Sequence, residues 1–383
     1  MNKKTALILS GGGARGAYQV GVLKGLAEIL KKERIKNPFQ ILSGVSAGAI
    51  NTAHLASQTE DFSTSVEKLI YLWSQLKAGQ VFQVNLFSIN KLSITQLFSL
   101  KNSTSDTKFN SLLKTDALQK LLLEHIDFAQ IQKNIENKKF DSVIITSNSY
   151  YHNSAVSFIA TQKNSKKLQW NDSRRHPLLT PIQVEHVMGS SAIPILFPPV
   201  KINGTDYGDG CVRNSTPCSP SLRLGADKLF VIGVRSQKNF EALTDLEQSP
   251  EQEKSVSMIS LLNTLLNAVL LDSVEQDVQR ILRINALIQN VQSGETSKNK
   301  KLLKEVPALC ISPTINIGQL ARQYAHKLPR LLRTSLSAFG SLDDAHEIIS
   351  YLMFDSEFCK KLISYGYEDA LSNQKDIINF FEK

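Results

Sequence analysis

Two glycine-rich stretches near the start of the chain carry residue types that suit acyl-transfer chemistry. The first, GGGARG, occupies residues 11–16, and the second, GVSAG, occupies residues 44–48. Ser46 lies in the pattern G-x-S-x-G, which exposes a nucleophilic serine on a sharp turn when it joins a strand to a helix. The small residues Gly44 and Gly48 keep such a turn free of side-chain clashes. The pattern therefore predicts that Ser46 is a nucleophile.

The first glycine stretch is compatible with two chemistries. Its glycines also match G-x-G-x-x-G, which binds a dinucleotide when an acidic residue ends the second strand of the fold. Here the apolar run 39–43 ends at Ser43 and leads directly into GVSAG, so no acid stands at that place. We therefore favour the alternative, in which N–H groups of the loop bind the negative oxygen of a tetrahedral intermediate. The predicted oxyanion-hole residues are Gly11, Gly12, Gly13, Ala14, Arg15 and Gly16.

Ser46 also needs a proton acceptor. None of the seven histidines lies in a recognisable motif, whereas Asp209 follows the hairpin signal Asn203-Gly204 and is followed by Gly210. A carboxylate between glycines can approach another backbone closely, so Asp209 is the candidate base. The side chain of Arg15 could either support the oxyanion hole or hold the loop through a salt bridge, and the sequence leaves both open. No residues have metal-ligand spacing, so no metal is expected.

The order of predicted elements explains how these residues would meet. Residues 5–10 and 39–43 are predicted strands, each followed by a predicted helix, at 16–36 and 44–58. This order is typical of a parallel sheet covered by helices. The loops that leave neighbouring parallel strands share one edge of the sheet, so the glycine loop is expected to face Ser46. Further strands are predicted at 140–150, 155–161, 228–234 and 307–313.

Two regions are expected along the chain. Residues 1–243 would form a catalytic α/β domain with a helical insertion at about 60–135, which could act as a lid. Residues 244–383 would form a mainly helical C-terminal region packed on that domain. The most apolar segment, 258–271, is predicted to be a buried helix, because Asn263 and Asn267 interrupt it. It falls short of the ~18 apolar residues of a membrane span.

Composition and charge limit the kinds of binding partner and cellular location that are expected. The formal charge of +9 is compatible with a solvated lysine-rich surface or with attraction to a polyanion. No zinc-finger or RNA-binding motif supports nucleic acid, so peripheral contact with an anionic membrane surface is the expected form of any such attraction. The four cysteines form no C-x-x-C pair, which favours free thiols in a reducing compartment. A cytoplasmic or peripheral membrane protein is expected, although secretion as an effector stays open. The Asn- and Lys-rich composition suggests a bacterial source.

Together the motifs resemble the patatin-like phospholipase family over about residues 5–235. The matching segments are GGGARG, GVSAG, SSAIPILFPPV at 190–200 and the Asp209-Gly210 pair. The resemblance implies a three-layer α/β/α fold with mostly parallel central strands and a Ser46–Asp209 dyad. It also implies an acyl-enzyme, phospholipid or lysophospholipid substrates, and neither calcium nor another cofactor. One departure is Cys211, because the family commonly has Gly or Ala after Asp-Gly.

Two alternatives to a lipid acyl hydrolase stay open. An acyltransferase would use the same dyad with an alcohol in place of water, and an inactive fold would act as a lipid-binding or protein-binding module. The sequence does not determine the head group, acyl chain or sn position of a substrate. It also does not say whether a protein activator is needed.

Overall fold

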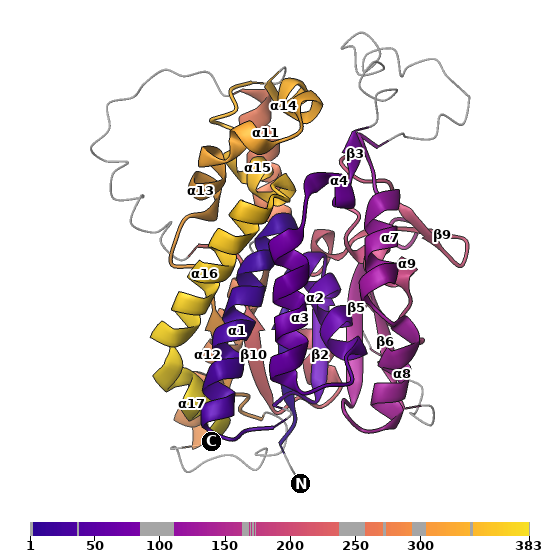
Figure 1. The fold of residues 1–383 in the computed structure, drawn as a ribbon. Helices are drawn as coiled ribbons and strands as arrows, with labels where there is room; N and C mark the ends of the chain where they lie inside the picture. Colours follow the sequence, from indigo (N-terminus) through magenta and orange to yellow (C-terminus); the bar gives the residue numbers. More distant parts are fainter. Residues whose placement is uncertain are drawn as a thin grey trace.

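One mixed sheet organises the part of the chain that the computed structural model describes, which is residues 3–36, 38–84, 111–162, 168, 170, 172, 174–236, 257–270, 273–292, 304–337 and 340–382. Its strands follow one another in the order β11-β10-β1-β2-β5-β6-β7, and the hairpin β8-β9 joins it through β5 (Figure 1). The bounds are β1 Thr5–Leu9, β2 Ile41–Val45, β5 Ser142–Ser149, β6 Ser154–Thr161, β7 Arg175–Leu179, β8 Val200–Ile202, β9 Thr205–Asp209, β10 Lys228–Ile232 and β11 Ala308–Ile311.

The central strands are parallel, as predicted. β1 pairs in parallel with β10 and β2, β2 pairs in parallel with β5, and β10 pairs in parallel with β11. β6 and β9 both run antiparallel to β5, which makes the sheet mixed. Every residue of β1, β2 and β10 is buried, as expected of strands that are covered on both faces.

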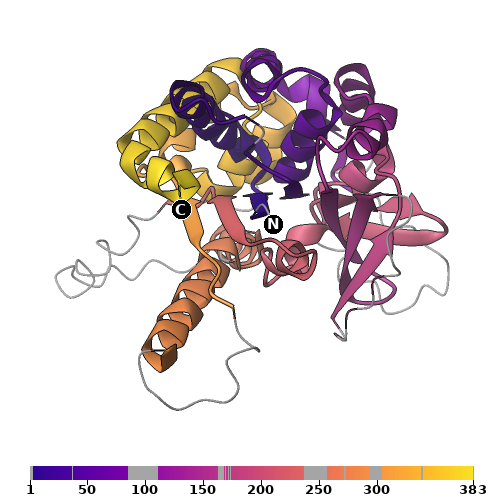
Figure 2. The ribbon, with the colours of Figure 1, turned by 90° about the horizontal axis from the view of Figure 1, so that it is seen from below.

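Helices cover both faces of the sheet. Along β1, Leu7 and Leu9 belong to one hydrophobic core and Ala6 and Ile8 to a second one, as the alternation of side chains along a strand requires. The first core is closed by α1 (Gly16–Lys32), α2 (Ala47–Ser57), α3 (Phe62–Gln75) and α16 (Ser356–Ser372). The second is closed by α10 (Ser219–Arg223) and α12 (Ser273–Gln292), on the opposite side of the sheet (Figure 2). The predicted three-layer α/β/α architecture is confirmed.

The C-terminal helices are closely joined to the N-terminal ones. A Cβ atom on Gly21 of α1 would lie 2.1 Å from the carbonyl oxygen of Ile363, and one on Gly366 of α16 would lie 2.2 Å from that of Tyr18. Only glycine permits backbones to approach this closely. β11 also extends the main sheet from the C-terminal region. The boundary at residue 243 stays a prediction, because 237–256 lie outside the described residues.

Further helices and a short strand pair complete the described part of the chain. The segment expected as a helical insertion contains α3, α4 (Ala78–Val81), α7 (Asp116–His125), α8 (Phe128–Glu136) and the short pair β3 (Gln83–Val84) and β4 (Leu113–Lys114), while 85–110 are not described. The remaining helices are α9 Val184–Ser190, α11 Met258–Leu270, α13 Ile317–Gln323, α14 Arg330–Ser337, α15 His346–Leu352 and α17 Gln374–Glu382.

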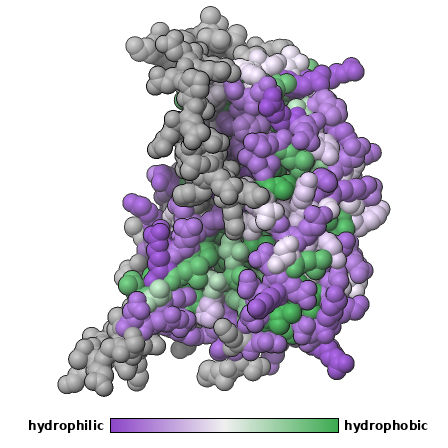
Figure 3. Space-filling view, turned by 90° about the vertical axis from the view of Figure 1, so that its left-hand side faces the viewer, coloured by the Kyte–Doolittle hydropathy of each residue, from purple (hydrophilic) through white to green (hydrophobic). Residues whose placement is uncertain are grey.

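Three expectations from the sequence differ from the structure. β7 has no apolar alternation and was not predicted, and α9 begins at Val184 instead of near Pro181. The prediction of a buried helix at 258–271 is wrong, because Met258, Leu261 and Leu265 of α11 are 59%, 50% and 62% exposed. Hydrophobic residues also reach the surface elsewhere, between the hydrophilic side chains of the face in Figure 3.

Candidate active site

Ser46 lies on the sharp turn between β2 and α2. Its φ of 54° is unusual for a residue with a side chain and is the strained backbone expected of a nucleophile elbow. A Cβ atom on Gly44 would lie 2.3 Å from the carbonyl oxygen of Gly48, and one on Gly48 would lie 2.2 Å from that of Leu9, so both flanking residues must be small. The Ser46 N–H donates to Ser190 Oγ at 2.9 Å, and the Ser191 hydroxyl donates to the Ser46 carbonyl at 3.1 Å. The two serines thus hold the turn in place.

The register of β5 brings Asp209 to Ser46. β6 occupies one edge of β5 along its whole length, so β2 and β9 must share the other edge. β2 pairs with β5 as far as Val45 opposite Thr146, and at the next position Asp209, the last residue of β9, lies opposite Ser147. Because the two strands run in opposite directions, the end of β2 meets the end of β9. Ser46, the next residue after β2, therefore stands at the level of Asp209.

Asp209 is fully buried, and burial raises the pKa of its carboxyl from 3.8 to about 6. Hydrogen bonding from the Ser46 side chain and from the Cys211 N–H acts in the opposite direction on this pKa. The Cys211 N–H donates to Oδ1 at 2.9 Å, whereas Oδ2 makes no hydrogen bond of normal geometry within the described part of the chain. Above pH 6 the group is a carboxylate with an oxygen free to accept a proton.

The glycine loop lies directly against Ser46. A Cβ atom on Gly11 would lie 2.9 Å from Ser46 Cβ and 2.3 Å from Cys211 Sγ. The N–H groups of Arg15 and Gly16 already donate to carbonyls within the loop. The N–H of Gly11 acts on the Cys211 sulfur, where it lowers a thiol pKa that burial raises well above its usual range. Gly12, Gly13 and Ala14 are therefore the remaining candidates for binding an oxyanion.

The side chain of Arg15 is directed at the C-terminal helix α15. Its guanidinium forms a buried ion pair with Glu347, its Nε donates to Ser350 Oγ at 2.8 Å, and it stacks on the Tyr351 ring at 4.8 Å. A Cβ atom on Gly13 would lie 2.3 Å from the Tyr351 carbonyl oxygen. Of the two roles left open for Arg15, these contacts match the salt bridge that holds the loop.

An apolar pocket opens from Ser46. Gly13, Ser46, Ala47 and Ser191 are among the residues that line it. Helices α3, α4 and α7 supply seven of its seventeen lining residues, so the segment expected as a lid takes part in shaping it. The other lining residues are Ile50, Leu72, Trp73, Leu76, Val81, Leu118, Leu121, Leu122, His125, Ile126, Ile193, Phe197 and Phe354.

Three contributors to this site were not assigned from the sequence. Ser190 and Ser191 lie in the segment quoted for its resemblance, but no pattern marks a serine that holds a turn by hydrogen bonds. His125 lines the pocket, and no signal in the sequence placed it there. Across the described part of the chain no histidine is hydrogen-bonded to Ser46, and no group of three His, Cys, Asp or Glu side chains is placed to hold a metal.

The fold and the site define an α/β protein with a serine on a nucleophile elbow beside a buried carboxyl group. The sequence model of the family described as "Patatin-like phospholipase" matches residues 7–222, which is more than half of the chain. The chain therefore belongs to the patatin-like phospholipase family. This membership supports a lipid acyl hydrolase in general and confirms the resemblance drawn from the motifs.

Similar solved structures have low sequence identity. VipD from Legionella pneumophila is 12% identical with a TM-score of 0.36, and the match covers 98% of this chain and 67% of that one. Human GIVD cytosolic phospholipase A2, in complex with methyl γ-linolenyl fluorophosphonate, is 14% identical with a TM-score of 0.38, and the match covers 99% and 60%. ExoU from Pseudomonas aeruginosa, in complex with SpcU, is 14% identical with a TM-score of 0.25, and the match covers 91% and 76%. No curated protein matches the chain.

Proposed function

We propose that this protein hydrolyses fatty-acyl esters of phospholipids or lysophospholipids through a Ser46–Asp209 dyad and an acyl-enzyme. The observation that carries the proposal is the meeting of β2 and β9 end to end on β5, which sets the serine and the carboxyl group side by side. Ser46 can act as the nucleophile only with Asp209 as its base, because a serine hydroxyl is a weak nucleophile without an adjacent base.

In the first half of the reaction, the Asp209 carboxylate accepts the proton of Ser46 Oγ as Oγ attacks the ester carbonyl carbon. The carbonyl oxygen becomes negative and is held by N–H groups of Gly12 and Gly13, and each well-aimed donor is worth about 3 kcal/mol. The C–O bond to the glycerol oxygen then breaks, and Asp209 returns the proton to that oxygen. The alcohol leaves and the acyl group stays on Ser46.

In the second half, water takes the place of the alcohol. Asp209 accepts a proton from the water as its oxygen attacks the acyl carbon, and the same N–H groups hold the second oxyanion. The bond to Ser46 Oγ breaks, Oγ regains a proton from Asp209, and the fatty acid leaves. No metal or cofactor is needed to balance these steps.

The pocket supports a long-chain acyl group as the substrate part next to Ser46. Apart from Ser46, His125 and Ser191, the side chains that line it are apolar. Removing apolar surface from water contributes about 0.8 kcal/mol for each buried CH₂ group. Each methylene group that the pocket takes up therefore stabilises the bound acyl chain.

The proposal is tested by labelling with a fluorophosphonate probe followed by peptide mass spectrometry. The wild type should be labelled on Ser46, Ser46→Ala should not be labelled, and Asp209→Asn should be labelled far more slowly. Asp206→Asn is the matched control, because Asp206 is an exposed residue of the same strand. Labelling that is unchanged in Asp209→Asn would refute the dyad.

Analysis of the products distinguishes hydrolysis from acyl transfer after the acyl-enzyme has formed. With phosphatidylcholine or its lyso form, a hydrolase releases free fatty acid even when glycerol is added as an acceptor. Transfer of most of the acyl groups to glycerol would instead identify an acyltransferase with the same nucleophile. Lipid binding without labelling or turnover, unchanged by Ser46→Ala, would identify an inactive binding module.

A further inference from the structure

Helix α11 packs Ile259 and Leu266 against the first hydrophobic core but exposes other apolar side chains to the surface. Its sequence MISLLNTLLNAVL contains no charged residue. Met258, Leu261, Leu265 and Val269 all project to the surface, and each is at least 36% exposed. A helix in contact with water normally buries such residues and exposes its polar ones. The outer face of α11, defined by these four residues, therefore lacks an apolar partner among the described residues.

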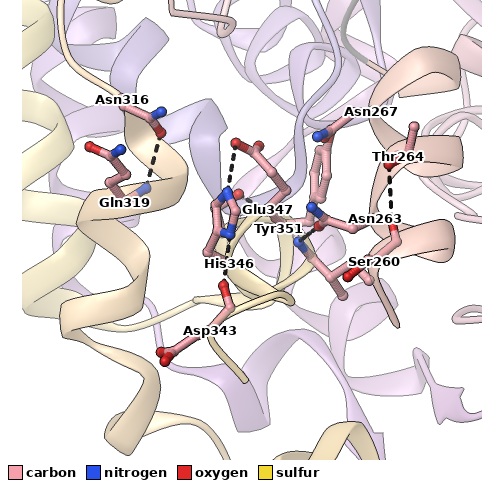
Figure 4. A network of polar contacts seen from close by, with 12 residues as sticks. Ser260, Asn263, Thr264, Asn267, Asn316, Gln319, Asp343, His346, Glu347 and Tyr351 are labelled. Carbon is pink, nitrogen blue, oxygen red and sulfur yellow. Dashed lines mark hydrogen bonds and ion pairs between the residues drawn. The ribbon is translucent and has the colours of Figure 1, made fainter. Parts of the chain in front are cut away.

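The two asparagines of α11 face the protein instead. Asn263 is buried, and its Oδ1 accepts the Ile348 N–H at 3.1 Å. One turn later, Asn267 Oδ1 accepts the Tyr351 hydroxyl at 3.3 Å. Figure 4 shows both asparagines directed at α15. These hydrogen bonds fix the orientation of the helix, so its apolar face is turned outwards by the structure.

The position of α11 relates this face to the active site. The helix packs against the 3-10 turn η3 (Gly210–Val212), which directly follows Asp209. α15, to which α11 is hydrogen-bonded, carries the Tyr351 and Glu347 groups that hold Gly13 and Arg15 of the glycine loop. A surface in contact with the outer face of α11 would therefore lie beside the catalytic elements.

Charged side chains of both signs lie near α11: the Ser257 hydroxyl just before the helix donates to Asp344 Oδ2 at 3.1 Å, and α14 contributes basic residues. Gly340, which follows α14, lies against Ile259 at the start of α11, and both helices stand at the same end of the molecule (Figure 1). α14 presents the exposed side chain of Arg330 next to Leu331, which is 51% exposed. Apolar side chains flanked by basic ones are typical of helices that lie in the interface of an anionic lipid layer.

We propose that the outer face of α11 docks onto an anionic lipid surface, with its apolar side chains among the lipid chains and the basic residues of α14 at the head groups. This inference rests on the proposed function, because a lipid acyl hydrolase must reach substrates within a lipid layer. The stretch Met258–Asn290 is also long and apolar enough to cross a membrane by length and composition alone, which is weak evidence by itself. The asparagine contacts with α15 favour docking by one face over insertion of the whole helix.

The test measures flotation of the Ser46→Ala protein with vesicles, so that it needs no catalysis. The vesicles are phosphatidylcholine alone or an equimolar mixture with phosphatidylglycerol. One variant carries Leu261→Asp and Leu265→Asp. The matched control carries Leu282→Asp and Leu287→Asp on α12, whose side chains are 45% and 63% exposed, close to the 50% and 62% of the α11 pair.

The Ser46→Ala protein with an unchanged α11 should bind the mixed vesicles better than vesicles of phosphatidylcholine alone. The α11 variant should bind about 10- to 100-fold more weakly, from the loss of two half-exposed leucines, and the α12 control should bind normally. Absence of vesicle binding by the Ser46→Ala protein, or equal losses in both variants, would overturn the proposal and favour a protein partner. Leu265→Gln repeats the test with a milder change, should the double variant fold poorly.

A second readout separates this inference from the proposed function. In the wild-type background, the α11 variant should hydrolyse a water-soluble short-chain ester normally and lose activity only on vesicles. Failure of all hydrolysis would refute the function but leave the flotation result standing. Equal losses on soluble ester and vesicles would contradict a docking role for the outer face of α11.

Discussion

Replacing Asp209 by Asn should stabilise the protein at neutral pH while removing its activity. Asp209 is fully buried, and burial is the main reason why its pKa lies near 6 instead of 3.8. The folded protein therefore holds this proton over a pH range in which the unfolded chain has already lost it. Between pH 4 and pH 6 the folded state binds more protons, so the free energy of unfolding falls as the pH rises.

The size of the effect follows from the two pKa values. The difference between 3.8 and about 6, at about 1.4 kcal/mol for each pKa unit, corresponds to about 3 kcal/mol of lost stability above pH 6. An asparagine has a similar shape, its oxygen can still accept the Cys211 N–H, and it carries no charge to bury. Asp209→Asn should therefore be about 3 kcal/mol more stable than the wild type at pH 8 and about equally stable near pH 4.

Urea denaturation at pH 4, 6 and 8 measures this difference. Asp206→Asn, on the exposed part of the same strand, should leave the free energy of unfolding unchanged at all three pH values. The kcat/KM of Asp209→Asn should fall by about 10²- to 10⁴-fold, the usual contribution of a general base. A variant that is less stable than the wild type at pH 8, or a difference that does not grow with pH, would refute the argument from burial.

Three further outcomes are expected. The kcat/KM of the wild type should rise with pH through about 6, because Asp209 must be charged to accept a proton; a flat profile between pH 5 and 7 would argue against it as the base. Glu347→Met should lower the free energy of unfolding by about 3–5 kcal/mol, because it leaves the Arg15 charge buried without its ion-pair partner. In urea denaturation the double variant with Arg15→Met should be less destabilised than Glu347→Met alone. Gly11→Ala should reduce ester hydrolysis strongly, and Cys211→Gly should restore part of it by removing the contact at 2.3 Å; full activity of Gly11→Ala would show that the loop can move.

The motif residues could be identified from the sequence because their chemistry depends on local backbone geometry. A serine between two glycines, directly after an apolar run and before a helical pattern, predicts an elbow wherever it occurs. Ser46 has that conformation, with its φ of 54°. The strands from which the motifs extend were also predictable, because fully buried parallel strands are continuous apolar runs.

The helix α11 shows why burial was harder to predict. Its apolar residues indicated a buried element, and its two asparagines indicated breaks in a membrane span. Which face of a helix meets the protein depends on its neighbours, and here α15 offers a backbone N–H and a hydroxyl that asparagines can accept from. The hydrogen bonds orient the helix so that Met258, Leu261 and Leu265 reach the surface, against the usual preference.

The sequence by itself indicated the parallel α/β core, the elbow and the candidate base, since each is marked by a local pattern of apolar runs, glycines or turn residues. Only the tertiary structure decided that Asp209 meets Ser46, because both strands align on the same edge of β5, a partner far from each in sequence. It also decided that Arg15 pairs with Glu347, 332 residues away. Such contacts depend on how distant segments pack, and no local pattern encodes them.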